Sequence, residues 1–420
     1  MAPEAMTATA PMRAAAVVRN AAVVLFALCC WLCGALAAQA APRIGVATMA
    51  PGEIFFERFG HNAIVVVNAP QDDRSPDGSV HGEPLSYNFG FFDMEEAGFV
   101  GRFVKGEMMY RLVELPWRED LQYYLDSGRG VTIQWLDLDD ARATALAMAL
   151  AENARPENAR YRYDYFVDNC ATRVRDAIDR ALDGTLKPQL TVRSQGNSFR
   201  GEAVRLASPA PWMWLGFDIG LGPSSDPPLS RWDDAYVPMR LADSLRDARL
   251  PDGRPLVLRE ERVAPHRIAP EPLEFRLVWW QWLIGGLALA LAWLRLDAHA
   301  PRASSGLAIA FWLACGVLGA VMLFIWTATE HRFAWANRNL LLMTPLALAL
   351  LPGAWRRVRG RAPGAAFKWL ASAIALGGVA AMLLYWSERV PQANAHWIAL
   401  MLPIHTAWAW IAWRSTDAKH

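Results

Sequence analysis

The residues best suited to chemistry lie in the stretch 161–178, YRYDYFVDNCATRVRDAI, where aromatic residues precede Asp168, Asn169 and Cys170. Cys170 is the single cysteine in the part of the chain that we expect to be exported and to face water. A lone cysteine in an oxidising compartment has no disulfide partner, so it is either buried and inert or a working thiol. Asp168 or Asn169 can cap a helix that begins at the cysteine, and the positive end of such a helix lowers a thiol pKa. The position therefore favours a nucleophile.

A thiol nucleophile needs a base, and the exported part offers three histidines, His61, His81 and His266. His81 lies in a polar loop and His266 in a Pro-rich approach to the membrane, where a ring is not held firmly. His61 follows Gly60 and directly precedes an apolar strand at 63–68, which holds the ring in place. We therefore predict that His61 activates the thiol. The alternative is a histidine that is merely hydrogen-bonded into a strand end.

The imidazole needs a third group that fixes its tautomer, and the candidates are Asn88 and the pair Asp168–Asn169. Arg173 follows Cys170 on the same helix and could bind a phosphate or carboxylate of the substrate, although a solvated surface arginine is an equal alternative. The sequence has no HExxH or EF-hand spacing and no Gly-rich phosphate loop, so we expect neither a metal nor a cofactor.

The composition separates a water-soluble part from a membrane part. The chain has 420 residues, of which 54% are hydrophobic and 20% are charged, and it contains 20 Trp. The apolar residues concentrate toward the C-terminus, which argues for a soluble domain followed by a membrane domain. A net charge of +1, without a long basic run in the soluble part, gives no indication of nucleic-acid binding.

Residues 1–41 have the pattern of a secretory signal, with Arg13 and Arg19 before an apolar run and small residues before the expected cleavage site. An uncleaved first transmembrane helix is the alternative, and both interpretations export the domain that follows. Residues 42–276 are expected to form this extracytoplasmic α+β domain. Its expected strands are 43–48, 63–68, 85–92 and 131–136, and its expected helices are 95–103, 117–127, 139–153 and 170–182.

Apolar segments after residue 276 predict an all-α bundle of five transmembrane helices at 277–413, followed by a cytoplasmic tail at 414–420. Each segment approaches the roughly 20 residues that span a bilayer, and most carry Trp at their ends. The segments are 277–294, 306–326, 339–355, 367–386 and 397–413. Basic residues gather in the connections that this topology makes cytoplasmic, which places the extracytoplasmic domain in the periplasm, at the inner membrane. These residues are Arg295, Arg302, Arg356, Arg357, Arg359, Arg361, Lys368, Arg414 and Lys419.

The topology leaves two outward loops, 327–338 and 387–396, beneath the periplasmic domain. The first carries His331 and Asn337, with Asn339 just beyond it. Polar residues at this height could bind a lipid headgroup or another part of a substrate, and interfacial solvation is the alternative.

A group of aromatic residues in the second half of the soluble part allows two interpretations. It consists of Trp212, Trp214, Phe217 and Trp232. We interpret the group as domain core, which such residues form most often. The alternative is a path for an acyl chain near the bilayer surface.

Several motifs resemble the N-terminal domain of the lipoprotein intramolecular transacylase family, also called the DUF4105 family. They are FGHNAIVV, YNFGFFD, GEMMYRL, DYFVDNCATRVRD and WDDAYVPMRL, and the resemblance covers most of residues 42–245. It implies a circularly permuted papain-like fold of the NlpC/P60 type, with His61 as the base and Cys170 as the nucleophile. The stretch TATEHRFAWANRNLLL is similar to a membrane-domain signature seen with such domains, which implies roles for the polar residues of the first outward loop.

In characterised members the resemblance implies transfer of an acyl chain from the diacylglyceryl-modified cysteine of a lipoprotein to the amino group of that cysteine. We therefore predict a membrane-embedded thiol acyltransferase whose partner is a lipid or a lipidated protein. Two alternatives stay open: a membrane-tethered cell-wall amidase or peptidase of the NlpC/P60 type, and a non-catalytic envelope scaffold in which Cys170 is merely buried. The sequence does not indicate an oligomeric state.

Overall fold

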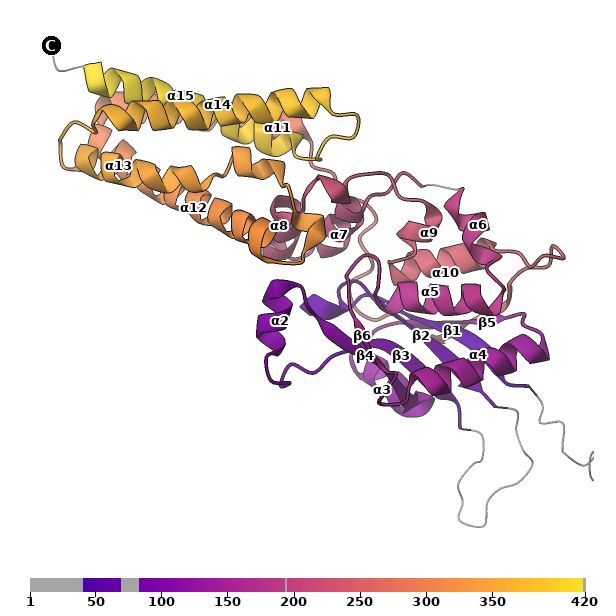
Figure 1. The fold of residues 1–420 in the computed structure, drawn as a ribbon. Helices are drawn as coiled ribbons and strands as arrows, with labels where there is room; N and C mark the ends of the chain where they lie inside the picture. Colours follow the sequence, from indigo (N-terminus) through magenta and orange to yellow (C-terminus); the bar gives the residue numbers. More distant parts are fainter. Residues whose placement is uncertain (1–40, 69–82, 193–194, 418–420) are drawn as a thin grey trace, which may run out of the picture.

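The computed structural model describes residues 41–68, 83–192 and 195–417. The predicted signal sequence, apart from its last residue, and residues 418–420 of the predicted tail lie outside the described residues. The N-terminal part is built on a seven-stranded antiparallel sheet with the strand order β6-β4-β3-β2-β1-β5-β7, and a separate helical part follows it (Figure 1). The strands are β1 (Arg43–Met49), β2 (His61–Val67), β3 (Leu85–Phe91), β4 (Met109–Pro116), β5 (Val131–Leu136), β6 (Arg160–Arg162) and β7 (Val257–Ala264).

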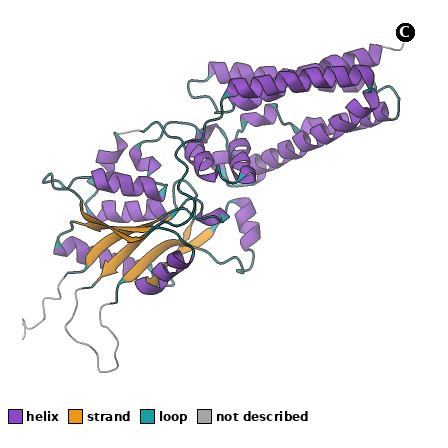
Figure 2. Ribbon diagram, turned by 180° about the vertical axis from the view of Figure 1, so that it is seen from behind, coloured by secondary structure: helices purple, strands orange, loops and turns teal. Residues whose placement is uncertain are grey.

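Helices cover both faces of this sheet (Figure 2). The elements of the N-terminal part are η1 (Phe55–Glu57), α2 (Phe99–Lys105), α3 (Trp117–Asp126), α4 (Asp140–Asn153), α5 (Cys170–Ala181), α6 (Leu186–Thr191), α7 (Phe199–Ala207), α8 (Pro211–Gly220), η2 (Pro223–Ser225), α9 (Arg231–Asp234) and α10 (Pro238–Asp247). The η elements are single turns of 3-10 helix.

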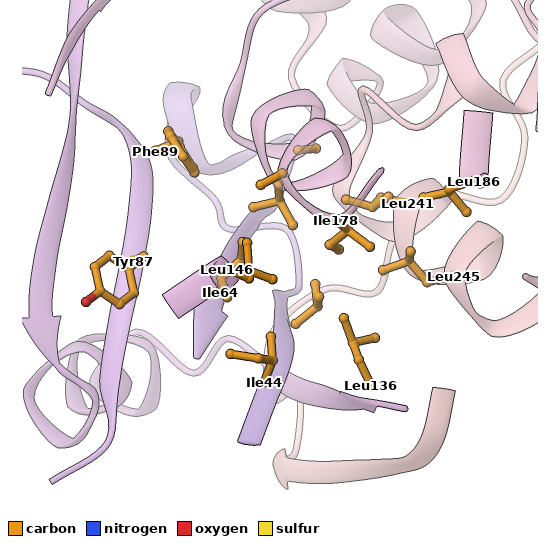
Figure 3. Close-up of a cluster of buried hydrophobic side chains, with 14 of the residues drawn as sticks. Ile44, Ile64, Tyr87, Phe89, Leu136, Leu146, Ile178, Leu186, Leu241 and Leu245 are labelled. Carbon is orange, nitrogen blue, oxygen red and sulfur yellow. The ribbon is translucent and has the colours of Figure 1, made fainter. Parts of the chain in front are cut away.

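Successive side chains of a strand point to opposite faces of the sheet, and apolar side chains occupy both faces here. Ile44 and Ile64 point to one face and pack with Leu146 of α4, Ile178 of α5 and Leu245 of α10, as Figure 3 shows. The neighbouring strand residues form a second cluster on the opposite face, together with α3. Burial of both faces fixes the register of β1 on β2, because a slip of one residue would exchange the two faces.

The predicted strand 131–136 coincides with β5, and the predicted helices 139–153 and 170–182 correspond to α4 and α5. The strands β4, β6 and β7 were not predicted. β7 reads VLREERVA and is mostly exposed, because it forms an edge of the sheet, so it lacks the apolar alternation of a half-buried strand. Among the aromatic residues expected in the core, Trp232 is buried but Trp212 on α8 is exposed.

The C-terminal part is a bundle of long helices that extends away from the sheet (Figure 1). Its elements are α11 (Trp279–His299), α12 (Pro301–Ala328), η3 (Arg332–Ala334), η4 (Arg338–Leu341), η5 (Pro345–Leu350), α13 (Leu351–Val358), α14 (Ala365–Ser387) and α15 (Ala395–Asp417). By length and composition, α12 and α14 are the two helices of the described chain that could cross a membrane.

The third predicted transmembrane segment, 339–355, is not one continuous helix. The chain forms η4, η5 and the short helix α13 there. Thr344 has an extended backbone and Pro345 after it lacks a backbone N–H, so the helical backbone is interrupted at this point. The broken segment packs closely on α12, where a methyl group on Gly319 would lie 2.4 Å from the carbonyl oxygen of Met343.

Helix α8 joins the two parts of the protein. Its residue Ile219 packs against the core of the helical bundle. The carboxylate of Asp218 accepts hydrogen bonds from Nε2 of His396, at 2.7 Å, and from the indole N–H of Trp397, at 2.6 Å. All three of these polar side chains are buried. The start of α15 is therefore held to α8 by buried polar contacts, which are costly to break.

The substitution Asp218→Ala tests this junction. It leaves His396 and Trp397 without their acceptor in a buried site, and each unpaired group costs about 1–3 kcal/mol. We expect the full-length protein in detergent to unfold at a lower temperature than the wild type. Glu157→Ala, at an exposed turn, is the control and should unfold like the wild type. Equal unfolding temperatures for the two variants would show that the junction does not stabilise the protein.

Candidate functional site

Cys170 is the first residue of α5, and Asn169 caps the helix. The side-chain oxygen of Asn169 accepts from the backbone N–H of Thr172 at 3.0 Å, and the hydroxyl of Thr172 accepts from the backbone N–H of Asn169 at 2.8 Å. The amide nitrogen of Asn169 donates to the carbonyls of Tyr165 and Tyr236. The hydrogen-bonding groups of Asn169 are thus used to hold the start of the helix, and the structure does not place this residue against the imidazole.

His61 is the first residue of β2, and its ring lies close enough to the thiol of Cys170 for each group to shift the pKa of the other. Helix α5 packs across β2 and β3, which brings the two residues together although they are far apart in the sequence. Gly60 lets the chain turn into β2 directly before His61, where Met49 and Met239 leave no room for a side chain. Its φ is +77°, and a methyl group there would lie 2.9 Å from the carbonyl oxygen of Met49 and the sulfur of Met239.

Asn88, on β3 beside His61, is the group that faces the second ring nitrogen. Nε2 of His61 lies 2.9 Å from the side-chain oxygen of Asn88, which leaves Nδ1 for the thiol. The amide nitrogen of Asn88 donates to Oγ of Ser86 at 3.1 Å and to Oδ2 of Asp120 at 2.9 Å. Because a carboxylate can only accept, these contacts fix which way the amide points and make its oxygen the acceptor for the ring.

Asp120 is a member of the site that sequence reasoning missed. It lies on α3, and its carboxylate is buried. It orients Asn88 and, through Asn88, the ring of His61. The signal available in the sequence was an acidic residue beside Leu121 and one turn before Tyr124, on the face of α3 that packs against the sheet. Such a residue is unusual because a buried carboxylate requires a partner.

The thiol raises the pKa of the imidazole, and the imidazole lowers the pKa of the thiol, so each group favours the charged form of the other. Burial alone raises the pKa of Cys170, but the charge and hydrogen bond of His61, together with the backbone N–H groups of Asn62 and Ala171, lower the pKa below its ordinary value. Burial alone likewise lowers the pKa of His61, but Cys170 and the hydrogen bond to Asn88 raise it above its ordinary value. The pair therefore favours a thiolate beside an imidazolium.

Gly90 leaves room for about one methyl group beside Cys170. A methyl group added there would lie 3.7 Å from Cβ of Cys170 and 3.9 Å from the hydroxyl of Tyr161, in ordinary contact with both. The hydroxyl of Tyr161 is buried and finds no hydrogen-bond partner in the part of the chain that the structure describes. A substrate oxygen placed beside Gly90 would meet an unused donor.

Arg173, predicted to bind substrate, is already paired. Its guanidinium contacts both carboxylate oxygens of Asp168, one of them at 2.8 Å, and lies 3.9 Å above the ring of Tyr161. An arginine held on two sides in this way positions Asp168 and Tyr161. The structure therefore gives no support to a direct role of Arg173 in binding an anion.

The polar residues predicted as a substrate platform also have protein partners. Asn337 and Asn339 are buried, and their amide nitrogens donate to the carbonyl of Ile219 at 2.7 and 3.0 Å. Their side-chain oxygens accept from Gln392 and Asn394 of the second outward loop. These two residues hold α8 to the helical bundle. Their polar groups are used within the protein, so these contacts give no support to the expectation that they bind substrate.

His331 connects the helical part to α2. Its Nδ1 accepts from the hydroxyl of Tyr165 at 2.5 Å, and its Nε2 donates to the carbonyls of Phe103 and Val104. Burial lowers the pKa of His331, although the two carbonyls oppose this effect. Both ring nitrogens are therefore occupied in the neutral form, and His331 also lines the cavity between the two parts of the protein.

A cavity of about 550 Å³ lies between the two parts of the protein. Its wall is formed by apolar side chains from α2, α8, α12 and the segment before Cys170, and charged side chains stand around it. The apolar residues include Phe103, Phe166, Phe217, Ile325 and Phe333, and the charged ones include Arg162, Glu330 and Arg332. Tyr163 lines this cavity, and burial raises its pKa, with a further contribution in the same direction from the charge of Cys170. The size suits a small amphiphilic ligand.

Among the described residues, no group of three or more His, Cys, Asp or Glu side chains is arranged to hold a metal ion.

Comparison with known protein families gives two matches. Residues 39–198 match the family model described as the Lnb N-terminal periplasmic domain, and residues 275–417 match the one described as the Lnb transmembrane domain. The search of curated proteins found no match, and the search of solved structures found none, so the permuted papain-like fold stays a prediction. The matches place α5 and the His61–Cys170 pair in the periplasmic domain and α11 to α15 in the transmembrane domain. The chain is thus a membrane protein that combines, in order, the periplasmic and transmembrane domains of the Lnb family.

Proposed function

We propose that this protein is a thiol acyltransferase that works at the periplasmic face of the inner membrane and carries the acyl group as a thioester on Cys170. The single observation that carries the proposal is the pairing of Cys170 with His61, whose second ring nitrogen is held by Asn88. A nucleophile, a base and an orienting group in this arrangement are the parts that acyl transfer requires.

The first half of the reaction begins with the thiol proton on His61. The thiolate attacks the carbonyl carbon of an ester, and an S–C bond forms while the carbonyl becomes an oxyanion. Collapse of this intermediate breaks the C–O bond, and the imidazolium of His61 gives its proton to the leaving alcohol. In the second half an amine attacks the thioester, His61 takes the amine proton, and Cys170 leaves as the thiolate. No other reactant is needed.

The oxyanion needs a donor close to the sulfur. The backbone N–H groups of Asn62 and Ala171 are engaged with the sulfur itself and stabilise the thiolate. The hydroxyl of Tyr161 is buried without a partner and borders the space beside Gly90. We assign Tyr161 as a donor to the oxyanion. A donor prepared in this way acts strongly, because no water has to be displaced or reoriented when the charge develops.

The acyl donor in this proposal is a lipid or a lipid-modified protein. A peptidoglycan peptide is polar, whereas the cavity at the junction of the two domains has an apolar wall and a charged surround, which is the pattern of an amphiphile. The Lnb match supports the same choice, since the predicted reaction moves an acyl chain within a lipoprotein. The membrane-tethered peptidase remains the alternative outcome of the experiments below.

Replacing Cys170 with Ala is expected to abolish amino-terminal acylation of lipoproteins in cells that depend on this protein for the reaction. The measurement is the mass of the N-terminal lipopeptide of an abundant lipoprotein. Cys315→Ala is the matched control, because Cys315 is buried among the membrane helices and should leave the mass unchanged. Unchanged acylation in Cys170→Ala, with altered peptidoglycan fragments in the same cells, would favour the peptidase.

The charge pairing predicts an unusual pH profile for alkylation of Cys170 by iodoacetamide. Because the thiol pKa is lowered, the rate should persist well below pH 8.5, the ordinary thiol range, and fall only as the pH drops through the lowered pKa. In His61→Ala the burial remains but the compensating charge is lost, so the profile should move to higher pH. The rate near pH 7 should then drop roughly tenfold for each unit of pKa shift. His266→Ala is the control, and a shared profile for all three proteins would contradict the pairing.

Tyr161→Phe removes only the unpaired hydroxyl. We expect kcat to fall roughly 10²-fold with little change in KM, because the lost hydrogen bond forms in the transition state. The pH profile of Cys170 alkylation should stay close to that of the wild type. Tyr236→Phe serves as the control, since Tyr236 is buried in another cluster and its hydroxyl donates to Phe199. A normal kcat, or a loss confined to KM, would remove Tyr161 from the reaction.

A further inference from the structure

Aromatic side chains form a continuous ridge between α8 and α2. Trp212 on α8 stacks on Phe55 with ring centroids 6.0 Å apart, and the adjacent Phe56 meets Phe92 at 5.6 Å. Phe92 in turn stacks on Phe99 of α2 at 5.7 Å. We call these five residues the aromatic ridge. Three of them, Trp212, Phe55 and Phe56, are exposed to solvent.

Further exposed apolar side chains flank the aromatic ridge. They are Ile54, Phe91, Met94, Val100 and Val104. The basic side chain of Lys105 follows in the last turn of α2. Single exposed apolar residues are ordinary on protein surfaces, but a connected group of this extent marks a surface that meets an apolar partner.

Both ends of the aromatic ridge are attached beside the periplasmic ends of membrane helices. At the α2 end, the carbonyl of Lys105 accepts from the backbone N–H of Glu330, at 2.7 Å, just after α12 ends. Figure 1 shows α2 beside this end of α12. At the other end, Trp214 of α8 lies 5.1 Å from Phe275, which shortly precedes α11. A ridge held at both ends near the membrane boundary lies at the level of the bilayer surface.

We propose that the aromatic ridge and its apolar flank insert into the outer leaflet of the phospholipid bilayer. The occupant is lipid and not a second copy of the chain, because this surface continues from the ends of helices that already lie in the membrane.

Insertion would orient the candidate site as well as anchor the domain. The residues Phe55 and Phe56 shortly precede His61, and Phe91 directly follows Gly90. The lipid-facing loops are therefore the same loops that leave the sheet next to the His61–Cys170 pair. The inference rests on the arrangement of the two domains and not on the thiol chemistry, so each can fail without the other.

Photocrosslinking of the full-length protein tests the insertion. A benzoyl-phenylalanine is placed at Phe56 or at Val100, and each variant is reconstituted into vesicles of phosphatidylethanolamine and phosphatidylglycerol and irradiated. Met148 on α4 is the matched control, since it is exposed to 68% and Val100 to 69%. We expect phospholipid adducts, identified by intact mass, to exceed those at Met148 roughly tenfold or more at both ridge positions.

Two results would overturn the proposal: adduct yields at Phe56 and Val100 no higher than at Met148, or adducts to a second copy of the chain in place of lipid. Alkylation of Cys170 at neutral pH reports whether each variant is folded around its site. The same crosslinks should form in a Cys170→Ala background. That result separates membrane insertion from catalysis, because a protein that inserts but does not transfer acyl groups would still give lipid adducts.

Discussion

The half-buried pair of Cys170 and His61 is the interaction on which the rest of the site depends. Charged groups removed from water are costly, so a thiolate and an imidazolium persist only where each has compensation. The sulfur is met by the backbone N–H groups of Asn62 and Ala171 and by the positive end of α5. The ring is held by Asn88, which Asp120 orients. If one partner is removed, the remaining charge has no compensating group, and the free energy of burying it is no longer offset.

The antiparallel sheet explains why these groups meet. β2 and β3 are antiparallel neighbours, and the start of β2 lies beside the end of β3. His61 and Asn88 therefore lie at the same end of these two strands, and α5 crosses both strands with Cys170 in its first turn. The loop that precedes β2 and the loop that follows β3 must therefore leave the sheet at this same end of the strands. These loops carry the exposed apolar residues, so one topological fact places the reactive pair and the apolar surface at the same end of the domain.

Local patterns were sufficient to predict part of this arrangement. Cys170 at the start of a helix, the capping residue Asn169 and the strand after His61 are each defined by a few neighbouring residues. The choice between Asn88 and Asn169 as the partner of the ring was not decided locally, because it depends on Asp120, which α3 brings from another part of the chain. The third membrane segment was predicted as one helix because its composition is apolar. The structure breaks the helix at Thr344 and Pro345.

Asn337 and Asn339 make their hydrogen bonds within the protein. A polar side chain at a membrane boundary looks the same in a sequence whether it binds a substrate or a backbone carbonyl, and here both residues bind Ile219 of α8. Together with Asp218, His396 and His331, the polar groups of the outward loops are used to hold the periplasmic domain in place. These contacts tie α2 and α8 to the transmembrane domain, whereas the His61–Cys170 pair belongs to the periplasmic domain.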